Sequence, residues 1–296
     1  MPELPEVETI RRDLCQKILN KKIVKVNIVN PKSVRNSRRD FLSGLRGNKI
    51  KSIDRVGKLM VFCLPEKEFL LVHLKMTGQL IYKQGKKIIA GGHGEPESAF
   101  GRPGDKVMAN LAVPNKHTRV IITFADKSKL FFNDLRLFGY MKKVGRAEKD
   151  KIAAAFGIEP LTRGFSLAKF AAIFKNRKTS LKAILLNQNL IAGLGNIYVD
   201  EVCFRAGLKP NRSAGNLAKT EIAKLYQAIQ FILKKAIAKR GTTFNNYIDA
   251  DGNKGNFIKY LQVYGQGGAP CKKCKNLLKK IRLSGRGTVF CEKCQK

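Results

Sequence analysis

Four cysteines near the end of the chain restrict its fold more than any other feature of the sequence. Cys271 and Cys274 form one Cys-x-x-Cys pair, Cys291 and Cys294 form a second, and sixteen residues separate the two pairs. Together they supply four thiolates, which is a complete tetrahedral shell for one Zn²⁺. Redox-active or chance Cys-x-x-Cys pairs are the alternative, but no βαβ pattern surrounds them. We therefore predict a hairpin folded around one structural zinc ion.

The tail is strongly basic, and so is the whole chain. From residue 265 to residue 296 the only acid is Glu292, against nine lysines and arginines. Over all 296 residues, 58 Lys and Arg oppose 22 Asp and Glu, which gives a formal net charge of +36. This excess is far more than solubility requires and predicts a polyanionic partner, with the zinc hairpin meeting phosphate.

The other cysteines and the short apolar runs indicate the cellular compartment in which the protein works. Cys15, Cys63 and Cys203 are scattered singly, and a total of 7 cysteines is odd, so a reducing compartment is the simpler interpretation. The longest apolar runs span only a few residues, and the N-terminus carries Glu3 and Glu6 where a secretory signal carries Lys or Arg. We expect neither a membrane-spanning helix nor a secretory signal.

The first half of the chain carries a helix pattern and then strand patterns. Val7, Ile10, Leu14 and Ile18 follow Pro5 at helical spacing, which predicts an amphipathic helix. From about residue 23 to residue 144, short β-rich runs predict a two-layer β domain; they are KVNIV, KLMVFCL, FLLVHLKM, RVIITF and KLFF. Residues 84–116, rich in Gly and Pro, are predicted to form a long mobile loop.

Helical periodicity dominates after about residue 149. Apolar residues recur at helical spacing in the stretches 167–174, 181–185 and 222–236, which predicts a helical second domain. Residues 242–260 follow neither the helix period nor the strand period. We predict that they form a polar loop before the zinc hairpin.

The N-terminal Pro2-Glu3 pair has two interpretations. Removal of the initiator methionine leaves Pro2 with a free secondary amine, and an α-amine titrates near pH 7.7 to 8, so part of it is a nucleophile at neutral pH. Such an amine forms an iminium with a sugar C1′, and Glu3 beside it is placed to act as general acid. A plain Pro-Glu helix start without chemistry explains the same residues. The pair alone leaves both interpretations open.

Three further motifs are also ambiguous when each is taken alone. Gly193-Leu194-Gly195-Asn196 suits a phosphate seat at a helix start or a plain helix-helix turn, and the basic residues around it favour phosphate. Lys58 lies in a tight turn between two predicted strands, where a solvated charge is the common outcome. Met76, Arg136 and Phe138 lie at strand ends and suit ordinary packing equally well.

Seven segments in order along the chain resemble one family. They are MPELPEVET at 1–9, RVGKL at 55–59, HLKMTG at 73–78, NDLRLFG at 133–139, GIEPL at 157–161, GLGNIYVDE at 193–201 and LQVYGQGGAPC at 261–271. In this order, and with the terminal zinc finger, they are similar to bacterial formamidopyrimidine-DNA glycosylase nearly from end to end.

The resemblance implies an α+β multidomain fold. Residues 1–148 would form an N-terminal two-layer β-sandwich with flanking helices that carries catalysis, 149–261 a helical helix-two-turn-helix domain that binds DNA, and 262–296 a C-terminal β-hairpin zinc finger. The implied activity is that of a bifunctional DNA glycosylase and AP lyase of base excision repair. It flips oxidised purines out of duplex DNA, excises them through a Schiff base and nicks the strand by β,δ-elimination.

The resemblance also implies roles for individual residues. Pro2 would be the nucleophile and Glu3 the general acid, with Lys58 transferring protons and Arg286 gripping phosphate near the lesion. The implied DNA contacts are His117, Arg136, Arg177, Lys182 and Asn196. Met76, Arg136 and Phe138 would fill the void left by the everted base. The resemblance further implies one structural zinc and no catalytic metal or organic cofactor. It implies a monomer in the bacterial cytoplasm, associated with the nucleoid and not with a membrane.

The chain also departs from the family pattern. Leu135 and Leu137 flank Arg136 where the family often has proline and a second basic residue, and Gln266 stands where arginine is usual. The stretch from Met76 to His117 is longer than in the family. Two other functions compete with excision of oxidised purines: the oxidised-pyrimidine activity of endonuclease VIII and non-catalytic binding of damaged DNA. Endonuclease VIII typically reads Pro-Glu-Gly-Pro-Glu at the N-terminus, whereas Leu4 stands here.

Overall fold

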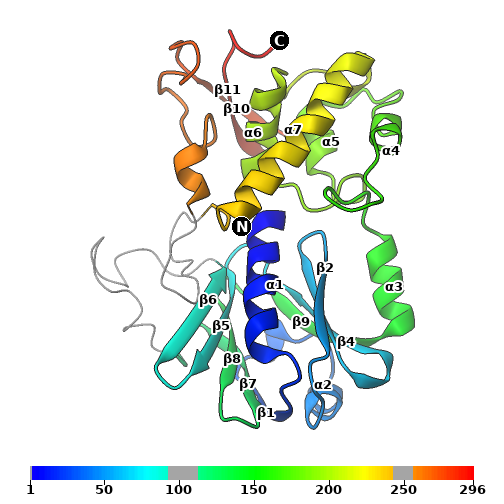
Figure 1. Cartoon of the computed structure of the whole chain (residues 1–296), viewed down its shortest axis with the longest axis vertical. Helices are drawn as coiled ribbons and strands as arrows, with labels where there is room; N and C mark the ends of the chain where they lie inside the picture. The colour runs from blue at the N-terminus through cyan, green and yellow to red at the C-terminus, as the bar shows by residue number, and fades with distance from the viewer. Residues whose placement is uncertain (1, 93–112, 243–255) are drawn as a thin grey trace. The chain divides into compact units, whose positions relative to one another are not determined.

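The computed structural model describes residues 2–92, 113–242 and 256–296, which fall into two compact units (Figure 1). The sandwich unit comprises Met1–Ala153 with Arg240–Ile258, and the helical unit comprises Ala154–Lys239 with Lys259–Lys296. The chain therefore returns to the sandwich unit after residue 239, and then enters the helical unit a second time.

The first helix, α1 (Leu4–Ile18), confirms the predicted amphipathic helix. Pro5 stands in its first turn, where a proline costs no helical hydrogen bond. Its apolar stripe of Val7, Ile10, Leu14 and Ile18 is fully buried.

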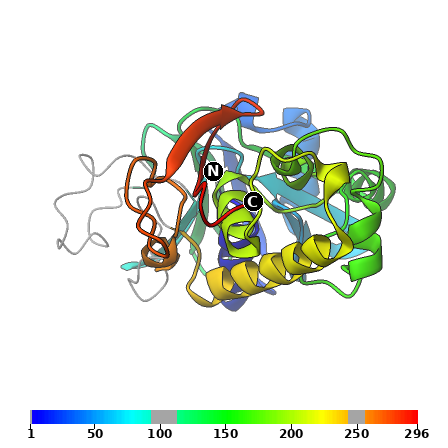
Figure 2. The same cartoon turned by 90° about the horizontal axis from the view of Figure 1, so that it is seen from above.

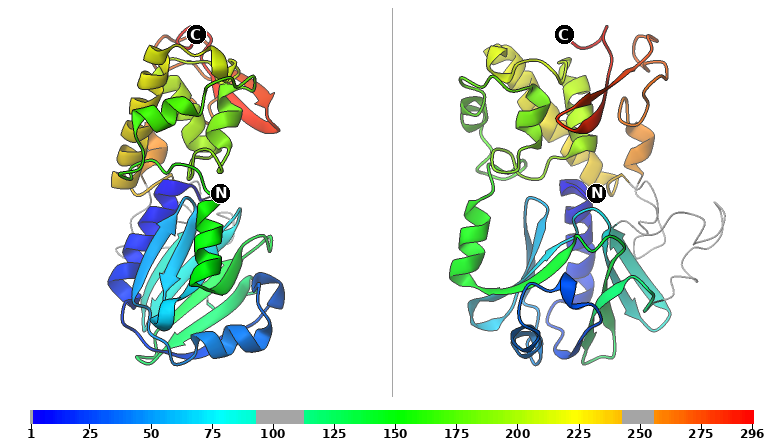
Figure 3. Two further views of the ribbon diagram at one scale, coloured as in Figure 1. Left: turned by 90° about the vertical axis from the view of Figure 1, so that its right-hand side faces the viewer. Right: turned by 180° about the vertical axis from the view of Figure 1, so that it is seen from behind.

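Two antiparallel sheets form the sandwich (Figure 3). One sheet has the order β1-β7-β8-β5-β6, with bounds Ile23–Ile28, Thr118–Phe124, Lys129–Asp134, Gly78–Gln84 and Lys87–Gly92. The other has the order β2-β3-β4-β9, with bounds Ser52–Val56, Leu59–Cys63, Glu68–His73 and Tyr140–Gly145. The predicted β-rich runs lie in β1, β3, β4, β7 and β8, so the predicted β domain is confirmed.

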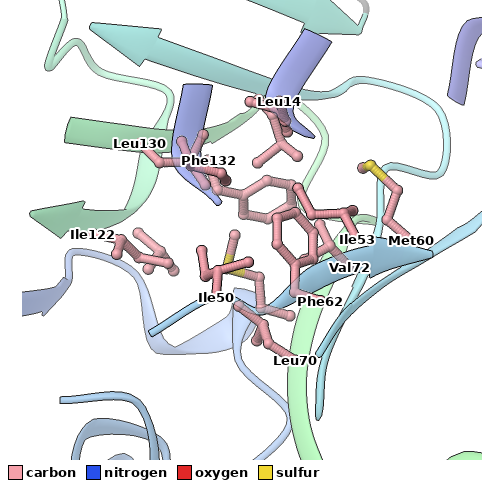
Figure 4. Packing of buried hydrophobic residues seen from close by; sticks show 14 of the residues in the cluster. Leu14, Ile50, Ile53, Met60, Phe62, Leu70, Val72, Ile122, Leu130 and Phe132 are labelled. Carbon is pink, nitrogen blue, oxygen red and sulfur yellow. The ribbon is translucent and has the colours of Figure 1, made fainter. Parts of the chain in front are cut away.

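One apolar core joins the two sheets and α1 (Figure 4). Phe62 of β3 and Phe132 of β8 are fully buried and lie close to Leu14 of α1. Burial alternates along β7, as expected for a strand with one face on a core. Two helices flank the sheets, α2 (Arg38–Leu45) and α3 (Arg146–Ala154). Two short 3-10 helices lie in connections: η1 (Pro31–Ser33) between β1 and α2, and η2 (Pro65–Lys67) between β3 and β4.

The predicted loop over 84–116 is wrong for part of its length. Residues 87–92 form β6, which pairs with β5 through a turn at Gly85, where φ is +56°. Ile88 of β6 packs with Ile81 and Phe131 in a small second core. This apolar contact holds the strand, although its Gly-rich sequence hides the strand period. Residues 93–112 lie outside the described part of the chain.

The helical unit contains α4 (Leu167–Ala172), α5 (Leu181–Leu186), α6 (Asn196–Ala206) and α7 (Lys219–Ala238), with a 3-10 turn η5 (Ala214–Asn216). It ends in the hairpin β10 (Lys279–Leu283) and β11 (Arg286–Phe290). Helix α6 packs against α7 on one side and β11 on the other (Figure 2). Of the predicted polar loop over 242–260, residues 257–260 form the 3-10 helix η6 (Phe257–Tyr260), and 243–255 lie outside the described residues. Within the described ranges, no helix has the length and apolar character to cross a membrane.

Candidate functional site

The N-terminal Pro2 and Glu3 are buried where α1 begins. Glu6 fixes the geometry of this start, because one of its carboxylate oxygens accepts the Glu3 backbone N–H at 2.9 Å. The Glu3 carbonyl in turn accepts the Val7 N–H at 3.0 Å and opens the helical ladder. The structure thus places the predicted acid at the N-cap of α1 and the predicted nucleophile directly before it. Met1 lies outside the described residues.

Glu6 also holds the return segment of the sandwich unit. Its second oxygen accepts the Thr242 N–H at 2.8 Å and the Thr242 hydroxyl at 3.0 Å. Two turns along α1, Asp13 pairs with Arg240 at 2.5 Å. Sequence reasoning missed both acids, because their partners lie more than two hundred residues away and no local pattern connects them.

Lys58 is buried, with 5% of its surface exposed, so it is not the solvated charge that a lone turn lysine suggests. It follows Gly57, whose φ of +58° makes the turn between β2 and β3. Arg55 secures this turn by donating to the Gly57 carbonyl at 2.8 Å and pairing with Glu8 of α1 at 3.2 Å. Helix α1 and the Lys58 turn are therefore tied together by charge-assisted contacts.

Glu8 is the centre of this tie. It accepts from Arg11 at 2.8 Å and from Arg12 at 2.7 Å, in addition to Arg55. Burial by itself raises the pKa of Glu8, but these guanidinium groups outweigh it and hold the pKa at about 2. The carboxylate therefore stays ionised at all physiological pH values.

His73 is a site residue that the sequence reasoning did not single out. It lies on β4, directly opposite Leu59 in the register of β3, which places it beside the Lys58 turn. Burial, with the charges of Lys75, Lys58 and Arg35, lowers the pKa of His73 to about 3, and its Nδ1 accepts the Lys75 N–H at 3.0 Å. It is a neutral imidazole beside a buried lysine. The sequence signal that could have identified His73 is its place in HLKMTG, one of the seven segments that resemble the family.

The loop between β8 and β9 presents two of the predicted void-filling residues. Buried Asp134 organises it, accepting the Thr77 hydroxyl at 2.5 Å and the Gly139 N–H at 2.6 Å. At the tip, Phe138 is 50% exposed, and the Arg136 guanidinium lies 4.7 Å from the centre of its ring. Neighbouring Leu135 is 47% exposed and Leu137 has a φ of +59°.

Met76 and His117 lie near the base of this loop. Met76, 37% exposed, directly precedes Thr77, which anchors the loop through Asp134. His117 accepts the Asp134 N–H through its backbone carbonyl at 2.9 Å. The sandwich unit therefore gathers Met76, His117, Arg136 and Phe138 around one buried aspartate.

In the helical unit, Lys182 is completely buried. Its ammonium pairs with Asp200 of α6 at 2.6 Å and donates to the Gly287 carbonyl of the hairpin at 3.3 Å. Asp200 accepts the Val289 N–H at 3.0 Å. Burial raises the pKa of Asp200 to about 6, against the opposing effect of Lys182. No surface of Lys182 is open to DNA in this structure, so the predicted direct DNA contact is not available to it, and its ammonium bonds the hairpin instead.

Asn196 joins the same hairpin to the Gly-rich turn. Its Nδ2 donates to the Gly287 carbonyl at 3.0 Å, and α6 begins at this residue after Gly195. Arg286 opens β11 after a turn at Ser284 and Gly285, and its side chain is exposed. Arg177, also exposed, precedes α5. Asn196 and Arg286 thus lie on two segments that are bonded to each other.

The four tail cysteines converge as predicted. Their sulfur atoms lie within 4.8 Å of one another, with Cys274 and Cys291 at 3.4 Å and Cys271 and Cys294 at 4.0 Å. Zn–S bonds of about 2.3 Å in a tetrahedron place the sulfurs about 3.8 Å apart, so this set fits one Zn²⁺. With all four positions filled by protein, the ion is structural.

Comparison with known proteins identifies three family domains along the chain. Residues 1–141 match the formamidopyrimidine-DNA glycosylase N-terminal domain, 156–247 match the formamidopyrimidine-DNA glycosylase H2TH domain, and 268–296 match the zinc finger found in FPG and IleRS. The formamidopyrimidine-DNA glycosylase of Desulfitobacterium hafniense is 42% identical over 281 residues, covering 94% of this chain and 93% of the relative. That of Heliobacterium modesticaldum is 38% identical over 277 residues, covering 93% and 92%.

Solved structures give the same match. A mutant of the Lactococcus lactis FPG protein in complex with Fapy-dG containing DNA superposes with a TM-score of 0.85 at 31% identity and covers both chains completely. The Lactococcus lactis Fpg complex with DNA containing an abasic site has a TM-score of 0.85 and covers 99% of each chain. The predicted sandwich, helical region and zinc hairpin are thereby confirmed as the architecture of this chain.

Proposed function

This chain belongs to the formamidopyrimidine-DNA glycosylase family, and we propose that it excises oxidised purines from duplex DNA with the Pro2 amine as nucleophile. It is a DNA glycosylase of base excision repair, with the AP lyase activity that is general to the family. The supporting observation is that Pro2 and Glu3 start a helix that Glu8 ties to the turn carrying buried Lys58.

The chemistry balances without an external oxidant or reductant. The lone pair of the Pro2 nitrogen attacks C1′ of the sugar, the bond from C1′ to the damaged base breaks, and the base leaves with a proton. The ring oxygen then departs from C1′ as a hydroxyl, which needs a second proton, and the C1′–N bond becomes an iminium. Loss of a C2′ proton breaks the C3′–O bond, and a further elimination breaks the C5′–O bond. Water finally hydrolyses the iminium and releases the amine.

We assign the proton transfers to Glu3 and Lys58. Glu3, beside the amine, delivers the proton to the ring oxygen. Lys58 shuttles protons during the eliminations. Its burial, in the turn that Arg55 and Glu8 tie to α1, supports this role because the turn holds the lysine in a fixed place close to the start of the chain.

We assign eversion of the base to the loop at Asp134. Taking a base out of the stack costs a few kcal/mol, and apolar or cationic wedges that enter the void offset this cost. Met76, Phe138 and the guanidinium of Arg136 supply such a wedge, and their exposure supports the assignment. His117, at the base of the loop, contacts the DNA backbone in this proposal.

We assign phosphate binding to the helical unit. Arg286 and Asn196 grip the backbone next to the lesion, Arg177 adds a second contact, and Lys182 holds the hairpin from beneath. The partner is duplex DNA with oxidised purines or abasic sites, bound by a monomer. The net charge of +36 supports a polyanionic partner. All relatives named above are bacterial, and we place the protein in the cytoplasm at the nucleoid.

The test is single-turnover excision on two duplexes, one with 8-oxoguanine opposite cytosine and one with an oxidised pyrimidine. We expect faster excision of the purine, near-complete loss in Pro2→Gly, which replaces the secondary amine with a primary one, and retention in Pro5→Ala, which keeps the secondary amine of Pro2. Faster excision of the pyrimidine would transfer the chain to an endonuclease VIII-like activity. Salt-sensitive DNA binding without excision on either duplex would make it a damage-binding protein.

A further inference from the structure

A row of alternating cations and aromatic rings lies on the helical unit, and the excision chemistry does not use it. We call it the cation-aromatic row; its members are Arg205 of α6, Phe231 and Lys235 in the C-terminal half of α7, Lys239 at the C-cap of α7, and Tyr260 of η6. The Arg205 guanidinium lies 3.3 Å from the centre of the Phe231 ring. The Lys235 ammonium lies 6.0 Å from the Phe231 ring and 4.2 Å from that of Tyr260, and Lys239 is 5.6 Å from Tyr260.

The two aromatic residues of the row lie at the surface, although large aromatic side chains are usually buried. Phe231 is 44% exposed and Tyr260 is 37% exposed. They are among the few large apolar side chains so exposed in the described part of the chain. Large aromatic groups left open beside cations commonly mark sites of protein recognition.

The row lies at the opposite end of α6 from the phosphate-binding residues of the same unit. Arg205 lies in the last turn of α6 and Asn196 is its first residue, so about 13 Å of helix separates them. A partner bound to the row therefore leaves Asn196 and Arg286 accessible.

Acidic residues are scarce in the part of the sequence that carries most of the row. Between residues 202 and 248 the sequence contains one acid, Glu221, which pairs with Arg212 at 2.6 Å. Arg205, Lys235 and Lys239 form no ion pair with any residue in the described ranges. Among the described residues, these three neighbouring cations thus have no carboxylate partner.

We propose that the cation-aromatic row binds an acidic peptide segment of a partner protein that carries large apolar side chains. Carboxylates pair with the three cations, and the apolar side chains pack on the exposed surface of Phe231. A single nucleic-acid strand fits less well, because base stacking needs free ring faces. Here Arg205 covers a face of Phe231, and Lys235 lies over Tyr260. The surface recruits the glycosylase to a partner while Asn196 and Arg286 of the same unit stay free.

The test measures binding of a defined peptide to the full-length protein already loaded with duplex DNA containing an abasic-site analogue. The probe is a short fluorescein-labelled peptide in which Asp and Glu alternate with Phe, followed by fluorescence anisotropy. We expect Phe231→Ala/Lys235→Ala to weaken binding about tenfold or more, because the double variant removes one cation and one ring that the peptide contacts. Lys151→Ala on α3, exposed and equal in charge change, should bind like the unchanged protein. Zinc content and excision rate should be normal in both variants.

Four results would overturn the proposal. Equal binding by the double variant and Lys151→Ala would show a diffuse charge effect, and so would equal affinity for a peptide with Gly in place of Phe. Displacement of the peptide by extra duplex would put it on the DNA face. If the peptide fails to bind while oligothymidylate binds the DNA-loaded protein and loses that binding in the double variant, the row would be assigned to nucleic acid.

Discussion

Replacement of Lys182 by Met tests whether the buried Lys182–Asp200 pair holds the hairpin. Methionine fills a similar volume but leaves the Asp200 carboxylate buried without its cation and removes the donor to the Gly287 carbonyl. Breaking a fully buried pair from one side costs about 3–5 kcal/mol of unfolding free energy. Lys178→Met, at an exposed position, is the matched control and should change it by less than about 0.5 kcal/mol.

The pH dependence of this loss follows from the pKa of Asp200. Burial already raises that pKa to about 6, and removal of Lys182 raises it further. A carboxyl whose pKa is higher in the folded than in the unfolded chain stabilises the fold at low pH and loses that contribution as pH rises. Relative to the unchanged protein, Lys182→Met should therefore lose up to about 1.4 kcal/mol of unfolding free energy per pH unit between pH 6 and pH 8.

Hydrogen exchange measured by mass spectrometry over the hairpin peptides, at pH values from 6 to 8 and corrected for intrinsic exchange, reports this local stability. The reasoning fails if Lys182→Met protects residues 279–290 as well as Lys178→Met does, or if its deficit is the same at every pH.

Three other predictions test the ion pairs of Glu8, the zinc site and the role of Phe138 in base eversion. Glu8 has a pKa of about 2, far below its ordinary value of 4.5, so up to about 3 kcal/mol of stability should be lost as pH falls from about 4.5 to 2. An acid titration followed by circular dichroism should show a smaller loss in Glu8→Gln; equal losses would remove Glu8 from the account. Cys294→Ser should release zinc, measured by metal analysis, and weaken DNA binding, whereas Cys63→Ser should keep both. Phe138→Ala should slow single-turnover excision of 8-oxoguanine about tenfold or more with little effect on abasic-site cleavage, and equal losses on both substrates would contradict a role in eversion.

The sequence predicted the parts of the fold whose signal is local. The Cys-x-x-Cys pairs, the stripe from Val7 to Ile18 and the β-rich runs each carry their own periodicity or spacing, and the structure confirms them. Strand β6 was missed because its Gly-rich sequence lacks alternation, and a contact of Ile88 with a distant strand decides its structure. Local pattern is sufficient only where packing agrees with it.

The candidate site was predictable in identity but not in environment. Motif matching singled out Lys58 and Lys182, yet nothing local says that both lysines are buried or that Asp200 accepts one of them. Glu6 shows the same limit, because its partner Thr242 is brought to it only by the tertiary fold. Burial and long-range pairing depend on the whole chain, and they determine the charge state of a side chain.

Borohydride trapping with mapping of the adduct tests most directly the claim that the Pro2 amine is the nucleophile. The purified protein is incubated with a duplex that carries 8-oxoguanine opposite cytosine, and borohydride is added to reduce the iminium. The product is digested, and the modified peptide is sequenced by mass spectrometry. We predict one covalent adduct, on the nitrogen of residue 2, in a chain that has lost Met1. An adduct on Lys58 or another lysine, or excision of the base without any trappable adduct, would contradict the account.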